Sequence, residues 1–142
     1  MNKNMRQLAI LITACLMSII LVGCDAPHRS KIDVTLCKKA GAEESEENAL
    51  RRLLMEKGYA IRERVEGDPF IKQELKGEKF STLWRADKKY NPTVIFAQDE
   101  KHSTILLFQL SGPLRPKSIT ELTKEINSSL VSACGASGVV MQ

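Results

Sequence analysis

A short apolar segment near the N-terminus decides which part of this chain is able to fold into a domain. Leu8–Val22 is a run of 15 residues that only Thr13 and Ser18 interrupt, and Lys3 and Arg6 precede it. A helix that crosses a bilayer needs about 20 apolar residues, so this run is short for a permanent span. Positive charges followed by a short apolar run are typical of a signal peptide, which is removed and takes no part in the fold.

The end of this run carries the motif Leu21-Val22-Gly23-Cys24. A leucine stands three residues before the cysteine, and a small residue stands directly before it. With this motif, the N-terminal 24 residues resemble a bacterial lipoprotein precursor. The resemblance implies that diacylglycerol and palmitate are attached to Cys24 and that the chain is cut just before it. It covers no part of the mature domain, for which the sequence indicates no family.

The resemblance also implies a location, the periplasm of a Gram-negative bacterium, with the protein held on a membrane by its lipid. Two or three acyl chains give stable anchoring, whereas one chain alone binds only marginally. Asp25 follows the cysteine and resembles the signal that retains enterobacterial-type lipoproteins in the inner membrane. The outer membrane is the alternative. An ordinary secretory signal, which would leave Cys24 as a plain thiol, is the alternative to lipidation.

Removal of the predicted signal peptide, residues 1–23, leaves 119 residues, which is enough for one hydrophobic core and too few for two. We expect a lipidated tether at 24–31, a single periplasmic domain at 32–135 and a flexible tail at 136–142. The mature chain has 19 basic and 17 acidic residues, a net charge of +2. This near-neutral balance argues against a nucleic acid as partner.

Three cysteines remain after the signal peptide, and lipid takes one of them. Cys37 and Cys134 form an even pair in an oxidising compartment, which predicts a disulfide bond. A bond that closes a loop of ~100 residues contributes about 4.7 kcal/mol in the chain-entropy model. A redox pair or a zinc site is the alternative, but the chain has no Cys-x-x-Cys spacing and only two histidines.

Apolar residues at helical spacing predict two main helices, at about 43–57 and 119–134. Four glutamates crowd the start of the first helix, where they suit the helix dipole and form a solvated face. Ser118 and Glu121 fit a capping box at the start of the second helix. Asp68-Pro69 predicts the start of a short helix at 69–76.

Alternating and β-branched runs predict strands at about 32–36, 59–65, 79–86, 93–98 and 104–110. The last two are separated by a polar turn of hairpin length. Antiparallel neighbours with helices at both ends of the order indicate an α+β fold. We expect a small two-layer sandwich, in which an antiparallel sheet of about three to four strands carries the two main helices on one face.

The sequence offers no recognisable catalytic constellation. A catalyst needs a nucleophile with a base, paired carboxylates in a cleft, or a metal. His28 falls in the tether and His102 in the hairpin turn, so both are expected to face solvent. We therefore predict that the protein is not an enzyme and that it has neither a cofactor nor a metal site.

Several residues are candidates for an interface with a partner. A basic patch is predicted from a loop and a strand face, and an aromatic side chain stands at a predicted corner. The chain also has a single tryptophan, the residue type most enriched among interface anchors. These candidates are Arg62, Arg64, Phe70, Trp84, Lys88, Lys89 and Tyr90. A solubilising surface is the alternative for the basic residues. For Trp84 the alternative is the core, and for Phe70 it is a lid on the sheet.

Tethering, small size and the lack of catalytic groups predict a protein that acts by protein–protein contact. Proteins of this build resemble inhibitors, immunity proteins, exclusion factors and assembly subunits. A periplasmic binder of a small apolar or lipid ligand, held between sheet and helices, is the first alternative. A structural envelope lipoprotein is the second alternative.

Overall fold

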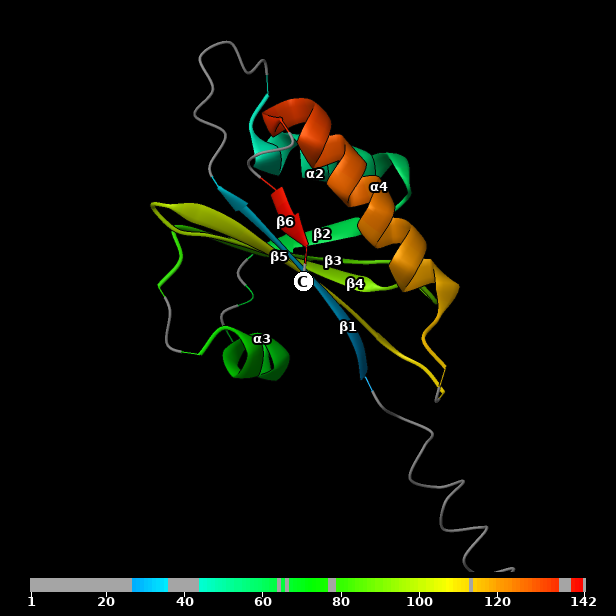
Figure 1. Ribbon diagram of the computed structural model, residues 1–142. Helices are drawn as coiled ribbons and strands as arrows, with labels where there is room; N and C mark the ends of the chain where they lie inside the picture. The colour runs from blue at the N-terminus through cyan, green and yellow to red at the C-terminus, as the bar shows by residue number, and fades with distance from the viewer. Residues whose placement is uncertain are drawn as a thin grey trace, which may run out of the picture.

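A computed structural model describes residues 27–35, 44–63, 65, 67–76, 79–112, 114–135 and 139–141. The fold is α+β, with one six-stranded sheet in the order β2-β3-β4-β5-β1-β6 (Figure 1). Every strand pair is antiparallel. The strands are β1 Pro27–Thr35, β2 Ala60–Glu63, β3 Thr82–Asp87, β4 Thr93–Gln98, β5 His102–Leu110 and β6 Val139–Met141; the helices are α2 Glu46–Glu56, α3 Pro69–Glu74 and α4 Lys117–Cys134.

The two longer helices, α2 and α4, pack against each other on one face of the sheet, and the short helix α3 lies on the other face (Figure 1). The main core is the space between this helix pair and the sheet. Its fully buried members include Leu50, Leu54, Ile119, Ile126 and Leu130. These residues are the apolar stripes that the helical spacing predicts, so the pair of helices on one face is as expected.

The two strands at the centre of the sheet are buried on both faces. In β4, four consecutive residues from Val94 to Ala97 are buried, and β5 is buried from Ser103 to Leu107. One face meets α2 and α4, while Ile95 and Leu106 on the other face join a second cluster beneath α3. A strand covered on both faces reads as a continuous apolar run, which is what the sequence shows here.

The boundaries of the predicted domain are wrong at both ends. β1 begins at Pro27, so five residues of the predicted tether belong to a strand. β6 lies within the predicted flexible tail and pairs with β1, from Val34↔Val139 to Ile32↔Met141. The sheet therefore has more strands than the three to four predicted. Backbone groups make the pairing, so the polar side chains of β1 gave no signal for it.

The helix starts also differ in detail from the prediction. α4 begins at Lys117 with Pro116 at the N-cap, and no side chain caps it. Ser118, the predicted cap, donates a hydrogen bond to Oε1 of Gln109 at 2.7 Å instead. In α2, Ser45 is the cap and accepts from the backbone N–H of Asn48. Among the described helices, none is both long and apolar enough to cross a bilayer.

The acidic start of α2 is not a uniformly solvated face. Glu46 is only 3% exposed, and its Oε1 accepts hydrogen bonds from Gln98 and Ser103, each at 3.0 Å. These partners belong to β4 and β5, so Glu46 joins the helix to the sheet. The prediction for this glutamate is wrong because a carboxylate with two donors is able to be buried, and helical spacing does not indicate where those donors lie.

Candidate functional site

Three predicted site residues lie outside the described residues. They are the lipidation site Cys24, the sorting residue Asp25 and the disulfide partner Cys37. Cys134 is buried at the end of α4 and is disulfide-bonded. Its pairing with Cys37 stays a prediction.

Trp84 belongs to the core and not to an exposed surface. Its side chain is fully buried, and its ring stacks on Phe96 with the centroids 5.2 Å apart. The indole Nε1 donates to Oε1 of Glu47 at 3.1 Å, and the guanidinium of Arg51 lies 4.7 Å from the ring centroid. A partner does not reach this side chain without opening the helix layer.

Phe70 folds back onto the sheet, which is the lid alternative. The ring of Phe70 on α3 stacks on Phe108 of β5 with the centroids 3.8 Å apart. The guanidinium of Arg29 lies 5.6 Å from the Phe70 centroid and forms an ion pair with Glu74 at 2.7 Å. Phe70 therefore holds α3 against the second face of the sheet.

Arg62 does not extend a free basic patch. It lies exposed on β2 and forms an ion pair with Asp87, the last residue of β3. Arg85 binds the same carboxylate and also reaches Asp68, the N-cap of α3. The remaining predicted member of the patch, Arg64, lies outside the described residues.

This network lowers the pKa of both carboxyl groups. Burial opposes the ionisation of Asp68, but hydrogen bonds from Arg85 and from two backbone N–H groups outweigh it and hold its pKa below the usual value. Burial also opposes the ionisation of Asp87, and hydrogen bonds from Arg85, Arg62 and Thr93 hold its pKa below the usual value. The carboxylate of Asp87, which precedes Lys88 in the chain, is therefore already bound by arginines.

The other three interface candidates, Lys88, Lys89 and Tyr90, are exposed and lie together in the turn between β3 and β4. The register brings this turn to the end of the sheet where β5 ends and β1 starts, since Phe108 pairs with Thr93 on one side and with Arg29 on the other. The loop into α4 leaves from the same place (Figure 1). We call this the Pro27 end, comprising Pro27, Lys88–Asn91, Leu110–Gly112 and Leu114–Lys117.

Tyr90 is presented outward by a fixed turn. Its side chain is 83% exposed, and its φ of 62° is a left-handed conformation that few non-glycine residues adopt. The backbone N–H of Asn91 donates to the Lys88 carbonyl at 3.1 Å, and the Asn91 side chain donates to the Lys89 carbonyl at 2.9 Å. Gln109 of β5 donates to the Tyr90 carbonyl at 3.4 Å, so the turn is tied to the sheet.

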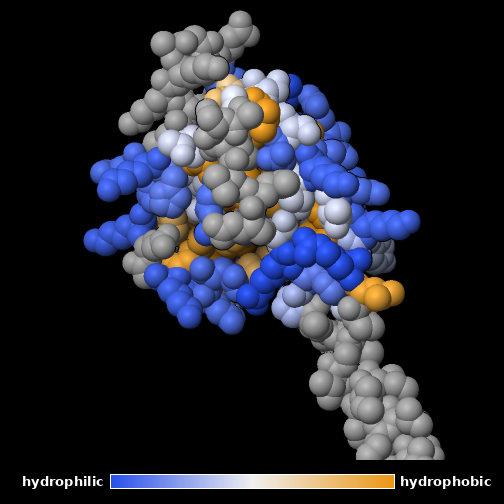
Figure 2. Space-filling model, in the orientation of Figure 1, coloured by the Kyte–Doolittle hydropathy of each residue, from blue (hydrophilic) through white to orange (hydrophobic). Residues whose placement is uncertain are grey.

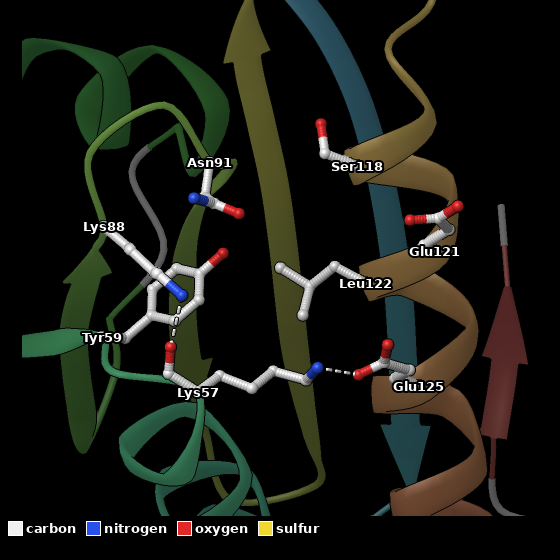
Figure 3. A pocket seen from close by; sticks show the side chains of 8 residues that line it. All are labelled: Lys57, Tyr59, Lys88, Asn91, Ser118, Glu121, Leu122 and Glu125. Carbon is white, nitrogen blue, oxygen red and sulfur yellow. Dashed lines mark hydrogen bonds and ion pairs between the residues drawn. The ribbon is translucent and has the colours of Figure 1, made fainter.

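A small polar pocket opens beside the Pro27 end, between the end of α2, the β3–β4 turn and α4 (Figure 3). Its volume is about 190 Å³. Lys57 reaches across it to form an ion pair with Glu125, and Lys88 donates to the Lys57 carbonyl at 2.6 Å. Burial, and to a lesser degree the charge of Glu125, raises the pKa of Tyr59 in this pocket to about 12.

The opposite end of the sheet carries a larger and more open groove of about 510 Å³. We call this the Asp99 end, comprising Lys79–Ser81 and Asp99–His102. Phe80 provides its apolar part, and charged groups of both signs form the rest of the wall. Oδ1 of Asp99 accepts from the backbone N–H groups of Lys101 and His102 at 2.6 and 2.9 Å, and these hydrogen bonds lower its pKa.

Sequence reasoning missed the second loop of the Pro27 end. Leu114 is 83% exposed and Leu110 is 66% exposed, and Arg115 and Lys117 beside them are exposed as well. The only signal was a leucine between two prolines, followed by the basic residues Arg115 and Lys117. The pairing of β5 with β1 and β4 brings this loop to the turn that holds Tyr90, and strand order is not readable from local spacing.

Comparison of the chain with protein-family models, with curated proteins and with solved structures found no match. In the part of the chain that the structure describes, no group of three or more His, Cys, Asp or Glu side chains is placed to hold a metal ion.

Proposed function

We propose that this chain is a lipid-anchored periplasmic protein that acts by binding another protein, with the Asp99 end as its binding surface. The observation that carries the proposal is the position of β1. It starts at Pro27, so two residues separate Cys24 from the sheet.

This short connection keeps the start of β1 close to the membrane once Cys24 carries lipid. Three Cα–Cα steps span at most about 11 Å, so Pro27 stays within that distance of the lipidated residue. β5 has nine residues, and at about 3.3 Å per residue it places the Asp99 end roughly 27 Å farther along the sheet. The Asp99 end is then the part of the sheet most accessible from the periplasm.

The groove at the Asp99 end has the composition of a protein-binding surface. An aromatic residue such as Phe80 is a common anchor of an interface, and a rim of both charges adds specificity. A partner that inserts an apolar side chain beside Phe80 would face Lys79 and Lys101 on one hand and Asp99 and Glu100 on the other. This chemistry suits an inhibitor, an immunity or exclusion factor, or an assembly subunit.

The pocket near the Pro27 end gives little support to the alternative of an apolar or lipid ligand. Ligand sites have volumes of roughly 300–1,000 Å³ and mostly apolar walls. This pocket has about 190 Å³, and its walls include Lys57, Glu121 and Glu125. The helix face of the sheet is filled by buried side chains of α2 and α4.

Photo-crosslinking in living cells tests the proposal. A photoreactive residue at Glu100, in the groove wall, is expected to capture one dominant partner that mass spectrometry identifies. The same residue at Lys124, exposed on α4, is the matched control and is expected to capture far less of that partner. Equal, diffuse crosslinking from both positions would contradict a binding surface at the Asp99 end.

A further inference from the structure

The exposed apolar side chains of the described residues gather towards the Pro27 end. Four large hydrophobic residues are strongly exposed, and three of them, Tyr90, Leu110 and Leu114, belong to this end. The fourth, Met55, lies in the last turn of α2, and the chain runs from this helix into the start of β2. Figure 2 shows an isolated hydrophobic group next to strongly hydrophilic ones where β1 starts in Figure 1.

Basic residues surround these apolar groups. Lys88, Lys89, Arg115 and Lys117 are all exposed, and the sequence has no acidic residue from 88 to 98 or from 110 to 120. Asp87 precedes the turn, but two arginines already bind its carboxylate. Glu121 and Glu125 line the pocket beside this end, where Lys57 pairs with Glu125. The Pro27 end therefore presents a net positive surface with apolar side chains on it.

Such a surface fits the interface of an anionic membrane. Lysine and arginine near a bilayer attract anionic headgroups, and tyrosine prefers the boundary between headgroups and acyl chains. Leucine side chains at loop tips insert shallowly among the headgroups. A weak affinity is sufficient, because a tether only two residues long gives a high effective concentration at the surface.

We propose that the Pro27 end lies against a bilayer that contains anionic phospholipid, with Tyr90 and Leu114 at the headgroup boundary. The proposal rests on the proposed lipid anchor at Cys24, which holds Pro27 within about 11 Å of the lipidated residue. The docked domain holds one orientation, with the groove at the Asp99 end directed into the periplasm. Without docking, the anchored domain tumbles on its tether.

The test uses the lipidated full-length protein in vesicles of phosphatidylethanolamine and phosphatidylglycerol. Leu114→Cys and Glu100→Cys each add one thiol for an environment-sensitive fluorophore, one at each end of the sheet. We expect spin-labelled lipid to quench the label at Leu114→Cys and a water-soluble quencher to be several-fold less effective there than at Glu100→Cys. Equal behaviour of the two labels overturns the proposal.

Charge reversal supplies the matched control. Lys89→Glu, combined with the label at Leu114→Cys, is expected to restore most of the access of the water-soluble quencher, whereas Lys101→Glu at the Asp99 end is not. Vesicles of phosphatidylcholine alone are expected to act like Lys89→Glu. If neither charge reversal nor lipid composition changes the accessibility of the Leu114→Cys label, anionic lipid is not the occupant and the proposal is overturned.

The mass of the N-terminal peptide separates failure of this proposal from failure of the proposed anchor. An unmodified Cys24 overturns both. A lipidated Cys24 together with a water-exposed label at Leu114→Cys overturns only the membrane contact. A protein crosslinked in cells through position 89 would then identify the Pro27 end as a protein interface.

Discussion

The two ends of the sheet use their charged side chains differently. At the Asp99 end, Asp99 accepts from backbone N–H groups, and nearby Glu46 is buried among donors from β4 and β5. At the Pro27 end, no ion pair of the described residues involves Lys89, Arg115 or Lys117. At the Asp99 end, Lys79, Glu100 and Lys101 are exposed and likewise form no ion pair among the described residues. Both ends therefore leave charges in solvent: the Asp99 end leaves charges of both signs, and the Pro27 end leaves mainly positive ones. The two ends therefore suit different surfaces, namely a protein partner at the Asp99 end and an anionic membrane at the Pro27 end.

Removal of the proposed anchor is expected to have the largest effect, because the two ends of the sheet meet different surroundings only when the Pro27 end is held at the membrane. Cys24→Ser lacks the thiol that we propose carries the lipid, so we expect no acylation and an uncleaved precursor. Gel mobility and the mass of the N-terminal peptide measure both. Cys15→Ser, inside the apolar run, is the matched control and is expected to be processed normally. Normal processing of Cys24→Ser would contradict the anchor.

Loss of the disulfide is expected to have the next largest effect, and it acts near the Asp99 end, where α4 finishes. Cys134 is disulfide-bonded, and with Cys37 as partner the bond closes a loop of ~100 residues. We expect Cys134→Ser to lower the free energy of unfolding by up to about 4–5 kcal/mol, measured in urea.

The pairing itself is tested by comparison of variants. Cys37→Ser and the double variant are expected to match Cys134→Ser, because each removes the same bond. Additive losses would show that the two sulfurs are not joined to each other. Tyr59→Phe, a conservative change in another buried residue, controls for general sensitivity of the fold to substitution.

The sequence predicted the elements of this fold better than their arrangement. Both main helices, the short helix after Asp68-Pro69 and the hairpin at residues 99–102 were predicted from local signals, namely spacing, caps and turn residues. The start of β1 and the whole of β6 were missed. β1 and β6 form through backbone pairing with strands that are distant in sequence, and local patterns do not encode such pairing.

The same limit explains the mixed result for the candidate site. Lys88, Lys89 and Tyr90 were grouped as candidates because they adjoin in sequence, but Leu114 becomes their neighbour only through the strand order. Arg62 was counted as part of the patch because a strand pattern shows which face a residue occupies and not that Asp87 lies beside it. Local sequence patterns identified the candidate side chains, whereas the strand order determines which of them lie beside an ion-pair partner.

A paired substitution sharpens the contrast between the ends. Glu46→Ala removes the carboxylate that accepts from Gln98 and Ser103, and a lost buried hydrogen-bond partner costs about 1–3 kcal/mol. Tyr90→Ala removes an exposed side chain, which changes stability by less than about 0.5 kcal/mol. Chemical denaturation measures both. A larger loss for Tyr90→Ala would show that the Pro27 end serves the fold and not an external surface.

The smallest expected effect is the difference between Asp87 and Asp99 in how much stability each loses on acidification. The pKa values of Asp87 and Asp99 both lie below the usual 3.8, so each contributes stability above that pH and loses it as the pH falls through the lowered value. Asp87 is partly buried between two arginines, whereas Asp99 is held in solvent by backbone N–H groups, where water screens its charge. Asp87→Asn is therefore expected to reduce the acid-induced loss more than Asp99→Asn.

The measurement for this prediction is the free energy of unfolding at neutral pH and below pH 3.8 for the wild type and both variants. The wild type is expected to lose the most stability on acidification, Asp99→Asn slightly less, and Asp87→Asn the least. The reverse order would mean that Arg62 and Arg85 do not hold Asp87 as an ion. In that case Asp87 would be free to offset Lys88 and Lys89, and the positive surface at the Pro27 end would be weaker than the arrangement of charges implies.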